Sequence, residues 1–374
     1  MTARPRFHRL RRLRLVFVLL AAVIALTVTA PTVFIAVTCY RPFIPHAGLR
    51  GETLRATAGV PNYVREGSAT FLTLPEWYIV YSTEEYAAFV ARRPPSRFPW
   101  LGSISQFWRT YAGACRATRK AYAFDAGEHL RLGLVGVSFS GEQALRGAYE
   151  VTLGRLGEWL GGHRTDEDAF ARRTAEEYGR FIHASPWYEF PFATKLRALW
   201  RETPLWGPHA ARKWERKVFL STAYGTNAVY GRLVIAVTGT AYAAEDQEIR
   251  AWMEDVPADA FADARVKKLR ALGPGAFIVG LPRHDTFTAV ALGLLRRRAS
   301  FRDIAGNDVI VLTALGPRDT RRALPAAAGV VLDERSLTNP AVTRLAVRAP
   351  VQALGPIVAA LERHGASIEY VYDY

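Results

Sequence analysis

Residues 15–38 constrain this chain most, because none of these positions carries a charged side chain. A helix rises ~1.5 Å per residue, so a stretch of this length can cross the ~30 Å hydrocarbon core of a bilayer. The preceding residues 1–14 are rich in arginine, as is typical of a segment that stays in the cytoplasm. We therefore predict a transmembrane helix over 15–38 in a single-pass protein of the cell inner membrane, with its N-terminus cytoplasmic and its bulk periplasmic or otherwise extracytoplasmic.

A cleaved signal peptide is the first alternative for this segment. Its apolar part is long compared with the ~7–15 residues of a signal peptide's apolar region. The sequence Val28-Thr29-Ala30 is a poor cleavage site, and Pro31 follows it directly. We favour a retained signal-anchor, which places Tyr40 and Arg41 at the far membrane interface.

Residues 218–243 form a second candidate span. They contain one charged residue, Arg232, but their apolar content is diluted by Gly, Ser, Thr and Tyr. An arginine in the middle of a span costs a few kcal/mol, so a buried amphipathic helix is the favoured interpretation. If this segment did span the bilayer, the C-terminal domain would return to the cytoplasm.

The net charge of +15 favours an anionic partner. The charge is mostly arginine and is scattered among many carboxylates, and outside the N-terminus no basic run is longer than 296–298. This pattern favours a lipid bilayer with anionic lipid over nucleic acid, which we do not expect as a partner. Other envelope proteins or self-association are further expected partners.

The two cysteines carry no motif. Cys39 and Cys115 are far apart in sequence and form neither a disulfide framework nor a metal-binding CxxC pair. The eight histidines include no HExxH motif, and no two of them are close neighbours in the chain. We therefore predict no local metal site and no cofactor, although distant histidines could still meet in space.

Residues 71–243 after a 39–70 linker are predicted to form a mainly helical, aromatic-rich domain. Ser82 with Glu85 has the spacing of a capping box, and Thr165 precedes three carboxylates as a helix cap does. Two clusters of Trp, Tyr and Arg are candidates for a belt at the lipid headgroup level. The predicted membrane-interface residues are Tyr40, Arg41, Trp100, Trp108 and Trp187.

Residues 275–374 have the clearest predicted architecture, after a 244–274 linker helix. Strands are expected at 276–281, 308–315, 343–348 and 367–373, with helices after the first and third and an extra strand at 329–332. Proline ends two of the strands, and Gly365 is placed to end the last helix. This pattern resembles the βαββαβ unit of ferredoxin-like domains, a fold that hosts many functions and implies no active site by itself.

One stretch resembles a catalytic motif. Residues 136–141, Gly-Val-Ser-Phe-Ser-Gly, are similar to the nucleophile elbow of α/β-hydrolases, with Ser138 as the nucleophile between a strand at 130–137 and a helix from Gly141. Ser140 stands where the motif has its second glycine, and no oxyanion loop precedes it. The competing interpretation is a helix that Ser138 or Ser140 caps.

Arg283 and His284 are weak candidates for binding a ligand or an anion, because they lie at a predicted turn from strand to helix. An exposed cap at Asp285 is the simpler interpretation of this turn.

Taken together, the sequence predicts a membrane-anchored α+β protein. Its expected function is that of a non-enzymatic structural or interaction protein that lies on the membrane surface. The alternatives are a membrane-tethered serine hydrolase that uses Ser138, and a ligand-sensing module in the C-terminal domain.

Overall fold

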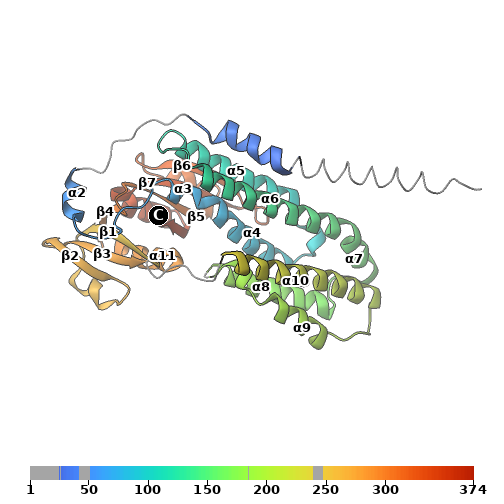
Figure 1. The fold of residues 1–374 in the computed structure, drawn as a ribbon. Coiled ribbons are helices and arrows are strands. Elements are labelled where there is room, and N and C mark those ends of the chain that lie inside the picture. The colour runs from blue at the N-terminus through green and yellow to red at the C-terminus, as the bar shows by residue number, and fades with distance from the viewer. Residues whose placement is uncertain (1–24, 26, 42–50, 184, 239–246) are drawn as a thin grey trace, which may run out of the picture.

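The computed structural model describes residues 25, 27–41, 51–183, 185–238 and 247–374. Its architecture is mixed: helices make up the part before residue 239, and two antiparallel four-stranded sheets follow (Figure 1). The predicted mixture of helix and sheet is therefore confirmed at this coarse level.

The first sheet, sheet A, is built around β1 (Glu248–Glu254). The strands lie in the order β2-β3-β1-β4, and every neighbouring pair is antiparallel. The connection from β3 to β4 is helix α11 (His284–Arg296). The other strands of sheet A are β2 (Lys267–Gly273), β3 (Ala276–Pro282) and β4 (Ser300–Ile304).

The second sheet, sheet B, repeats this topology. Its order is β6-β7-β5-β8, again antiparallel throughout, and helix α12 (Leu354–Arg363) connects β7 to β8. The chain therefore contains the same βββαβ unit twice in succession. The strands of sheet B are β5 (Val309–Pro317), β6 (Gly329–Arg335), β7 (Val342–Pro350) and β8 (Ser367–Tyr372).

Alternate residues of β5 enter two different cores. Ile310 and Leu312 face a core that both sheets share with α11 and α12. Val309 and Val311 face the opposite side, where Trp77 and other side chains of the helical part cover the sheet. Because successive strand residues point to opposite faces, a strand buried on both faces is a nearly continuous apolar run, as residues 309–312 of β5 are.

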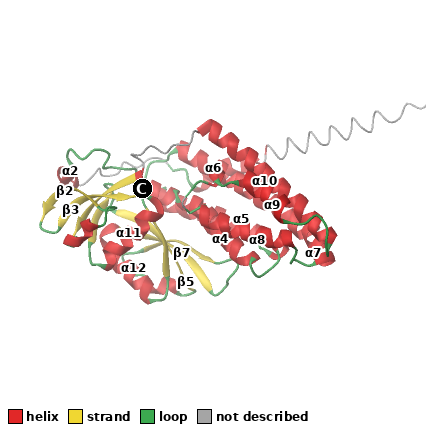
Figure 2. Cartoon of the chain, turned by 90° about the horizontal axis from the view of Figure 1, so that it is seen from below, coloured by secondary structure: helices red, strands yellow, loops and turns green. Residues whose placement is uncertain are grey.

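The helical part packs against sheet B mainly through α4 (Leu74–Val90). The hydroxyl of Tyr81 on α4 lies 2.7 Å from Thr313 Oγ1 and 3.0 Å from the Tyr372 hydroxyl. In Figure 2, α6 and α10 lie along one edge of the molecule, away from β5 and α12.

The remaining helices have the following bounds: α2 (Gly51–Thr57), α3 (Ala69–Leu72), α5 (Trp100–Thr118), α6 (Ala126–Tyr149), α7 (Arg155–Gly161), α8 (Asp166–Phe181), α9 (Phe192–Glu202) and α10 (Ala210–Thr238). A π-helical turn, η2 (Glu150–Gly154), joins α6 to α7. The 3-10 helices are η1 (Pro95–Arg97), η3 (Trp187–Glu189), η5 (Ala258–Ala262), η6 (Thr320–Ala323) and η7 (Val351–Ala353).

The membrane topology predicted from the sequence requires correction. Within the described parts of the chain, no helix combines the length and the apolar content that a bilayer crossing requires. The single-pass inner-membrane assignment, with its signal-anchor and transmembrane helix, is therefore not supported. Residues 15–24 and 26 of the predicted span 15–38 lie outside the described residues, and residues 27–38 are helical.

The same finding applies to the second candidate span, 218–243. Its described part forms the C-terminal section of α10, and residues 239–243 lie outside the described residues.

The predicted ferredoxin-like domain over 275–374 also requires correction. Its first strand, β3, and its first helix, α11, belong to sheet A together with β1 and β2, which precede residue 275. The expected linker helix within 244–274 is instead β1, η5 and β2. Each unit has three strands before its helix, so the order is βββαβ rather than βαββαβ.

The structure confirms two of the predicted helix ends and contradicts a third. Thr165 and Asp168 form the two bonds of a capping box at the start of α8, and Gly365 has φ +82° just after α12, as predicted. The capping box at Ser82 is wrong, because α4 begins at Leu74 and Ser82 lies in its middle. The Ser82 hydroxyl instead lies 2.7 Å from the Ser103 hydroxyl on α5.

Two arginines that join helices to sheet B allow a matched test of burial. The Arg344 side chain is 8% exposed and binds Glu85 on α4 and Glu369 on β8, whereas the Arg109 side chain is 54% exposed and binds Glu334 on β6. We expect Arg344→Met to cost about 3–5 kcal/mol of unfolding free energy, because it leaves two shielded carboxylates without their cation. Arg109→Met should cost less than about 1 kcal/mol.

Urea unfolding followed by circular dichroism measures both changes. Equal losses of stability in the two variants would contradict the view that the buried ion pairs of Arg344 stabilise the contact between α4 and sheet B more than the exposed pair of Arg109 does.

Candidate functional site

The N-terminal helix, residues 27–38, is fastened to α5 and α6 at its end. Cys39 directly follows the helix and forms a disulfide with Cys115 of α5. Phe34 packs against Trp108 and Tyr111 of α5, with ring centroids 5.0 and 5.2 Å apart. A disulfide therefore connects two segments that the sequence gave no reason to pair.

His129, in the first turns of α6, lies beside this disulfide. One donor atom each from His129, Cys39 and Cys115 lie within 4.8 Å of one another, and all three residues are buried. The Tyr111 hydroxyl lies 2.9 Å from His129 Nδ1, and the imidazole stacks on the Phe124 ring at 4.6 Å. Burial lowers the pKa of His129 and raises the pKa of Tyr111.

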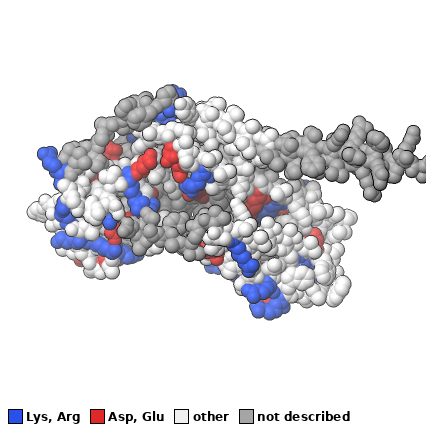
Figure 3. Space-filling model, viewed as in Figure 1, with Lys and Arg blue, Asp and Glu red and all other residues white. Residues whose placement is uncertain are grey.

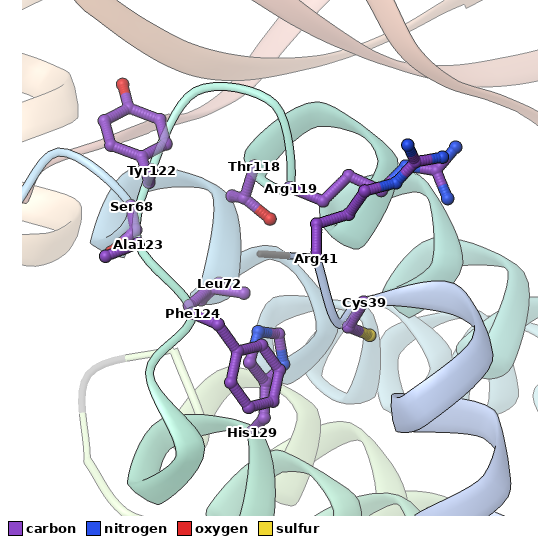
Figure 4. A pocket seen from close by; sticks show the side chains of 10 residues that line it. All are labelled: Cys39, Arg41, Ser68, Leu72, Thr118, Arg119, Tyr122, Ala123, Phe124 and His129. Carbon is purple, nitrogen blue, oxygen red and sulfur yellow. The ribbon is translucent and has the colours of Figure 1, made fainter. Parts of the chain in front are cut away.

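A small cavity of about 10 Å³ adjoins this cluster, which is room for roughly one water molecule. Figure 4 shows Cys39, His129 and Phe124 around it, with Arg41 and Arg119 at its other end. We name Cys39, Cys115 and His129 the cysteine–histidine cluster.

A network of buried ion pairs lies between α10 and the turn η2. Arg216 binds both carboxylate oxygens of Glu150 at 2.8–3.0 Å, and both side chains are almost fully buried. Arg212 binds Asp168 at 2.8 Å and Glu215 at 2.7 Å. Burial raises the pKa of Glu150, while the charge of Arg216 opposes that rise.

Two lysines extend this network to the start of α8. Lys213 binds Asp166 at 2.7 Å and Glu167 at 3.1 Å, and Lys217 lies 3.5 Å from Glu167. Buried charges are tolerated only when they are paired, so these pairs fix how α10 sits against α8 and η2.

Helices α6, α7 and α10 and the turn η2 expose many large apolar side chains. On α6 and its continuation, Leu145 is 76% exposed and Trp159 is 81% exposed. On α10, Val218, Val229 and Leu233 are more than half exposed, and Arg232 is the only charged residue between 218 and 236. We define the apolar face by the following exposed side chains: Leu130, Leu134, Leu145, Val151, Leu153, Leu156, Trp159, Leu160, Val218, Val229, Tyr230 and Leu233.

The surroundings of this apolar face carry little charge. Figure 3 shows that most charged side chains in that view lie over the sheets, while the surface over α5 and α6 is largely uncharged. Arg155 and Arg164, on and just after α7, are exposed. These helices therefore bury the ion pairs of Arg212 and Arg216 and expose large apolar side chains together with some charged ones.

The predicted nucleophile Ser138 lies on the exposed side of helix α6. The strand expected at 130–137 is wrong, because these residues belong to α6, so the turn from strand to helix of a nucleophile elbow is missing here. The nearby Ser140 hydroxyl accepts a hydrogen bond from Trp108 Nε1 at 3.0 Å.

Arg283 and His284 do lie at the start of a helix, but the Arg283 side chain binds residues at the C-terminal end of the described chain. Arg283 occupies the N-cap position of α11, and its guanidinium donates to Asp373 at 2.6 Å and to the Tyr374 carbonyl at 2.7 Å. Burial lowers the pKa of His284. Anion binding at these residues and the ligand-sensing alternative stay predictions.

The predicted interface aromatics are scattered. Trp100 is buried against Tyr86 and Phe98, Trp108 packs with Phe34, and Trp187 packs on Tyr230 at 5.1 Å. Tyr40 is exposed, and its ring contacts Phe124, while Arg41 lies at the small cavity. Of these residues, only Trp187 packs on a member of the apolar face.

Comparison of the chain with protein-family models, with curated proteins and with solved structures gives no match in any of the three.

His183 gives a pH-dependent contact beside the α11 start. Its Nε2 lies 2.7 Å from Glu84 on α4, and its Nδ1 lies 3.7 Å from Asp285 on α11. The hydrogen bond to Glu84 raises the pKa of His183 above its usual value. Its contribution to stability is thus complete below the unfolded pKa of about 6.5 and is lost as the pH rises through the folded pKa.

We expect His183→Gln to destabilise the protein at about pH 6 and to have little effect at about pH 9. Urea midpoints at both pH values measure the difference, and His163→Gln is the control. A pH-independent loss of stability would contradict an ionic role for His183.

Proposed function

We propose that this chain is a non-enzymatic interaction protein that binds a lipid surface through the apolar face of α6, η2, α7 and α10. The observation that carries the proposal is the inverted arrangement of these helices. Arg212 and Arg216 on α10 are at most 2% exposed. Leu145 on α6 and Trp159 on α7 are mostly exposed. Helices that face water normally have the opposite pattern.

The composition of the apolar face supports lipid rather than a protein partner. Its members are mainly leucine and valine, which are under-represented among residues that dominate protein interfaces. Large exposed apolar patches mark either protein or membrane contacts, and leucine, valine and tryptophan suit the boundary between headgroups and acyl chains. This binding mode needs no helix that crosses the bilayer.

The charge around the apolar face supports anionic lipid. Arg155 and Arg164 are exposed at its α7 end, whereas Glu158 on α7 turns inward to accept a bond from the Ser96 hydroxyl. Each basic residue near an anionic surface contributes about 1 kcal/mol, and the net charge of +15 acts in the same direction.

Binding of the full chain to vesicles tests this proposal. We expect the wild type to float with vesicles that contain phosphatidylglycerol, and less with pure phosphatidylcholine. Leu145→Glu and Trp159→Glu should each weaken binding about tenfold or more, because each removes the burial of a large apolar side chain. Leu269→Glu, at a partly exposed leucine on β2, is the control and should leave binding unchanged.

Two results would overturn the proposal. One is vesicle binding that neither substitution on the apolar face changes. The other is a dimer in sedimentation velocity that Leu145→Glu dissociates, without any vesicle binding by the wild type, which would assign the apolar face to self-association.

A further inference from the structure

The cysteine–histidine cluster has a donor set that suits a metal ion. Thiolate sulfur and imidazole nitrogen are the preferred ligands of Zn²⁺, and Cys39, Cys115 and His129 bring one donor atom each within 4.8 Å of one another. All three residues are buried, and their backbones belong to three separate segments that the fold holds together: the end of the N-terminal helix, α5 and α6.

We propose that reduction of the Cys39–Cys115 disulfide converts this cluster into a binding site for one Zn²⁺ ion. The two thiolates and one imidazole nitrogen supply three ligands. The adjoining cavity of about 10 Å³ has room for a water molecule as the fourth, which completes tetrahedral coordination. The disulfide and the metal site are then alternative states of the same three residues.

The contacts of the His129 ring with Tyr111 and Phe124 orient it as the ring of a metal-binding histidine is oriented. Metal-bound histidines commonly have a second partner that orients the ring, and here the Tyr111 hydroxyl lies 2.9 Å from Nδ1. The Phe124 ring stacks on one face of the imidazole. The two cysteines are held by helices. Cys115 lies within α5, and the Cys39 backbone N–H donates to the Ile35 carbonyl at the end of the N-terminal helix.

A dithiol reductant gives two electrons to the disulfide, so the Cys39–Cys115 bond breaks, the reductant closes its own disulfide, and its two protons complete the thiols. Zn²⁺ binding then releases both thiol protons to water.

Zinc titration of the full chain tests this inference. The protein is reduced with a phosphine, which breaks the disulfide by transferring oxygen from water to phosphorus and adds no competing thiol. We expect the reduced wild type to take up one Zn²⁺ per chain in competition with a chromogenic chelator, and the oxidised protein to take up none. Co²⁺ in place of Zn²⁺ should give a thiolate-to-metal charge-transfer band that the oxidised protein lacks.

Substitutions identify the ligands. Cys39→Ser, Cys115→Ser and His129→Gln should each weaken Zn²⁺ binding to the reduced protein at least about tenfold, whereas His163→Gln should not. Zn²⁺ should also raise the melting temperature of the reduced wild type, which is a readout independent of any variant that fails to fold.

Equal Zn²⁺ binding by the reduced and the oxidised wild type would overturn the inference. So would a charge-transfer band that survives Cys39→Ser together with Cys115→Ser. Vesicle binding measures a different surface, so failure of the lipid proposal and failure of this inference are separate outcomes.

Discussion

Burial of sheet B on both faces is the constraint on which the rest of the structure depends. One face of β5 contributes Ile310 and Leu312 to the core of the sheets, and the other contributes Val309 and Val311 to the contact with α4. A shift of one residue in the pairing of β5 would exchange the two sets and would also move Thr313 away from the Tyr81 hydroxyl. The register of this strand therefore sets the position of the helical part relative to both sheets.

The helical part differs from the sheets because buried ion pairs lie between its helices. Arg216 with Glu150 and Arg212 with Asp168 hold α10 against η2 and α8, in addition to the apolar contacts of Leu220 and Tyr224. Buried ion pairs add little net stability but penalise alternative arrangements, in which a charge would lose its partner. We infer that they specify how α10 is rotated, so that Val229 and Leu233 point outward.

The sequence predicts those elements whose signal is local. Gly365 and Thr165 act through the chain immediately next to them, and their roles were predicted correctly. β2 was missed because it is an exposed strand at the edge of sheet A, with few apolar positions to mark it. The pattern of β3 predicts a strand but not its neighbours, which is why β1 and β2 were assigned to a linker helix.

The cysteine–histidine cluster could not be predicted, because its members come from distant parts of the chain. For α6 the signal was present: Leu132, Gly136 and Phe139 recur at helical spacing and are all buried. Of the two glycines in the motif, Gly136 has a packing reason, as does the earlier Gly133, whereas a Cβ on Gly141 would meet nothing within 4 Å. A Cβ on Gly136 would lie 2.5 Å from the Phe107 ring, and one on Gly133 would lie 3.1 Å from Ile35.

Helix α6 takes part in both candidate features. His129 lies in its first turns beside the disulfide, and Leu145 lies near its C-terminus on the apolar face. At a rise of ~1.5 Å per residue, His129 and Leu145 are about 24 Å apart along α6, whereas Leu130, also on the apolar face, directly follows His129. Coupling between the two features would require an element with two discrete arrangements. Leu145→Glu therefore changes the apolar face far from the cysteine–histidine cluster, whereas a substitution of Leu130 would act next to both.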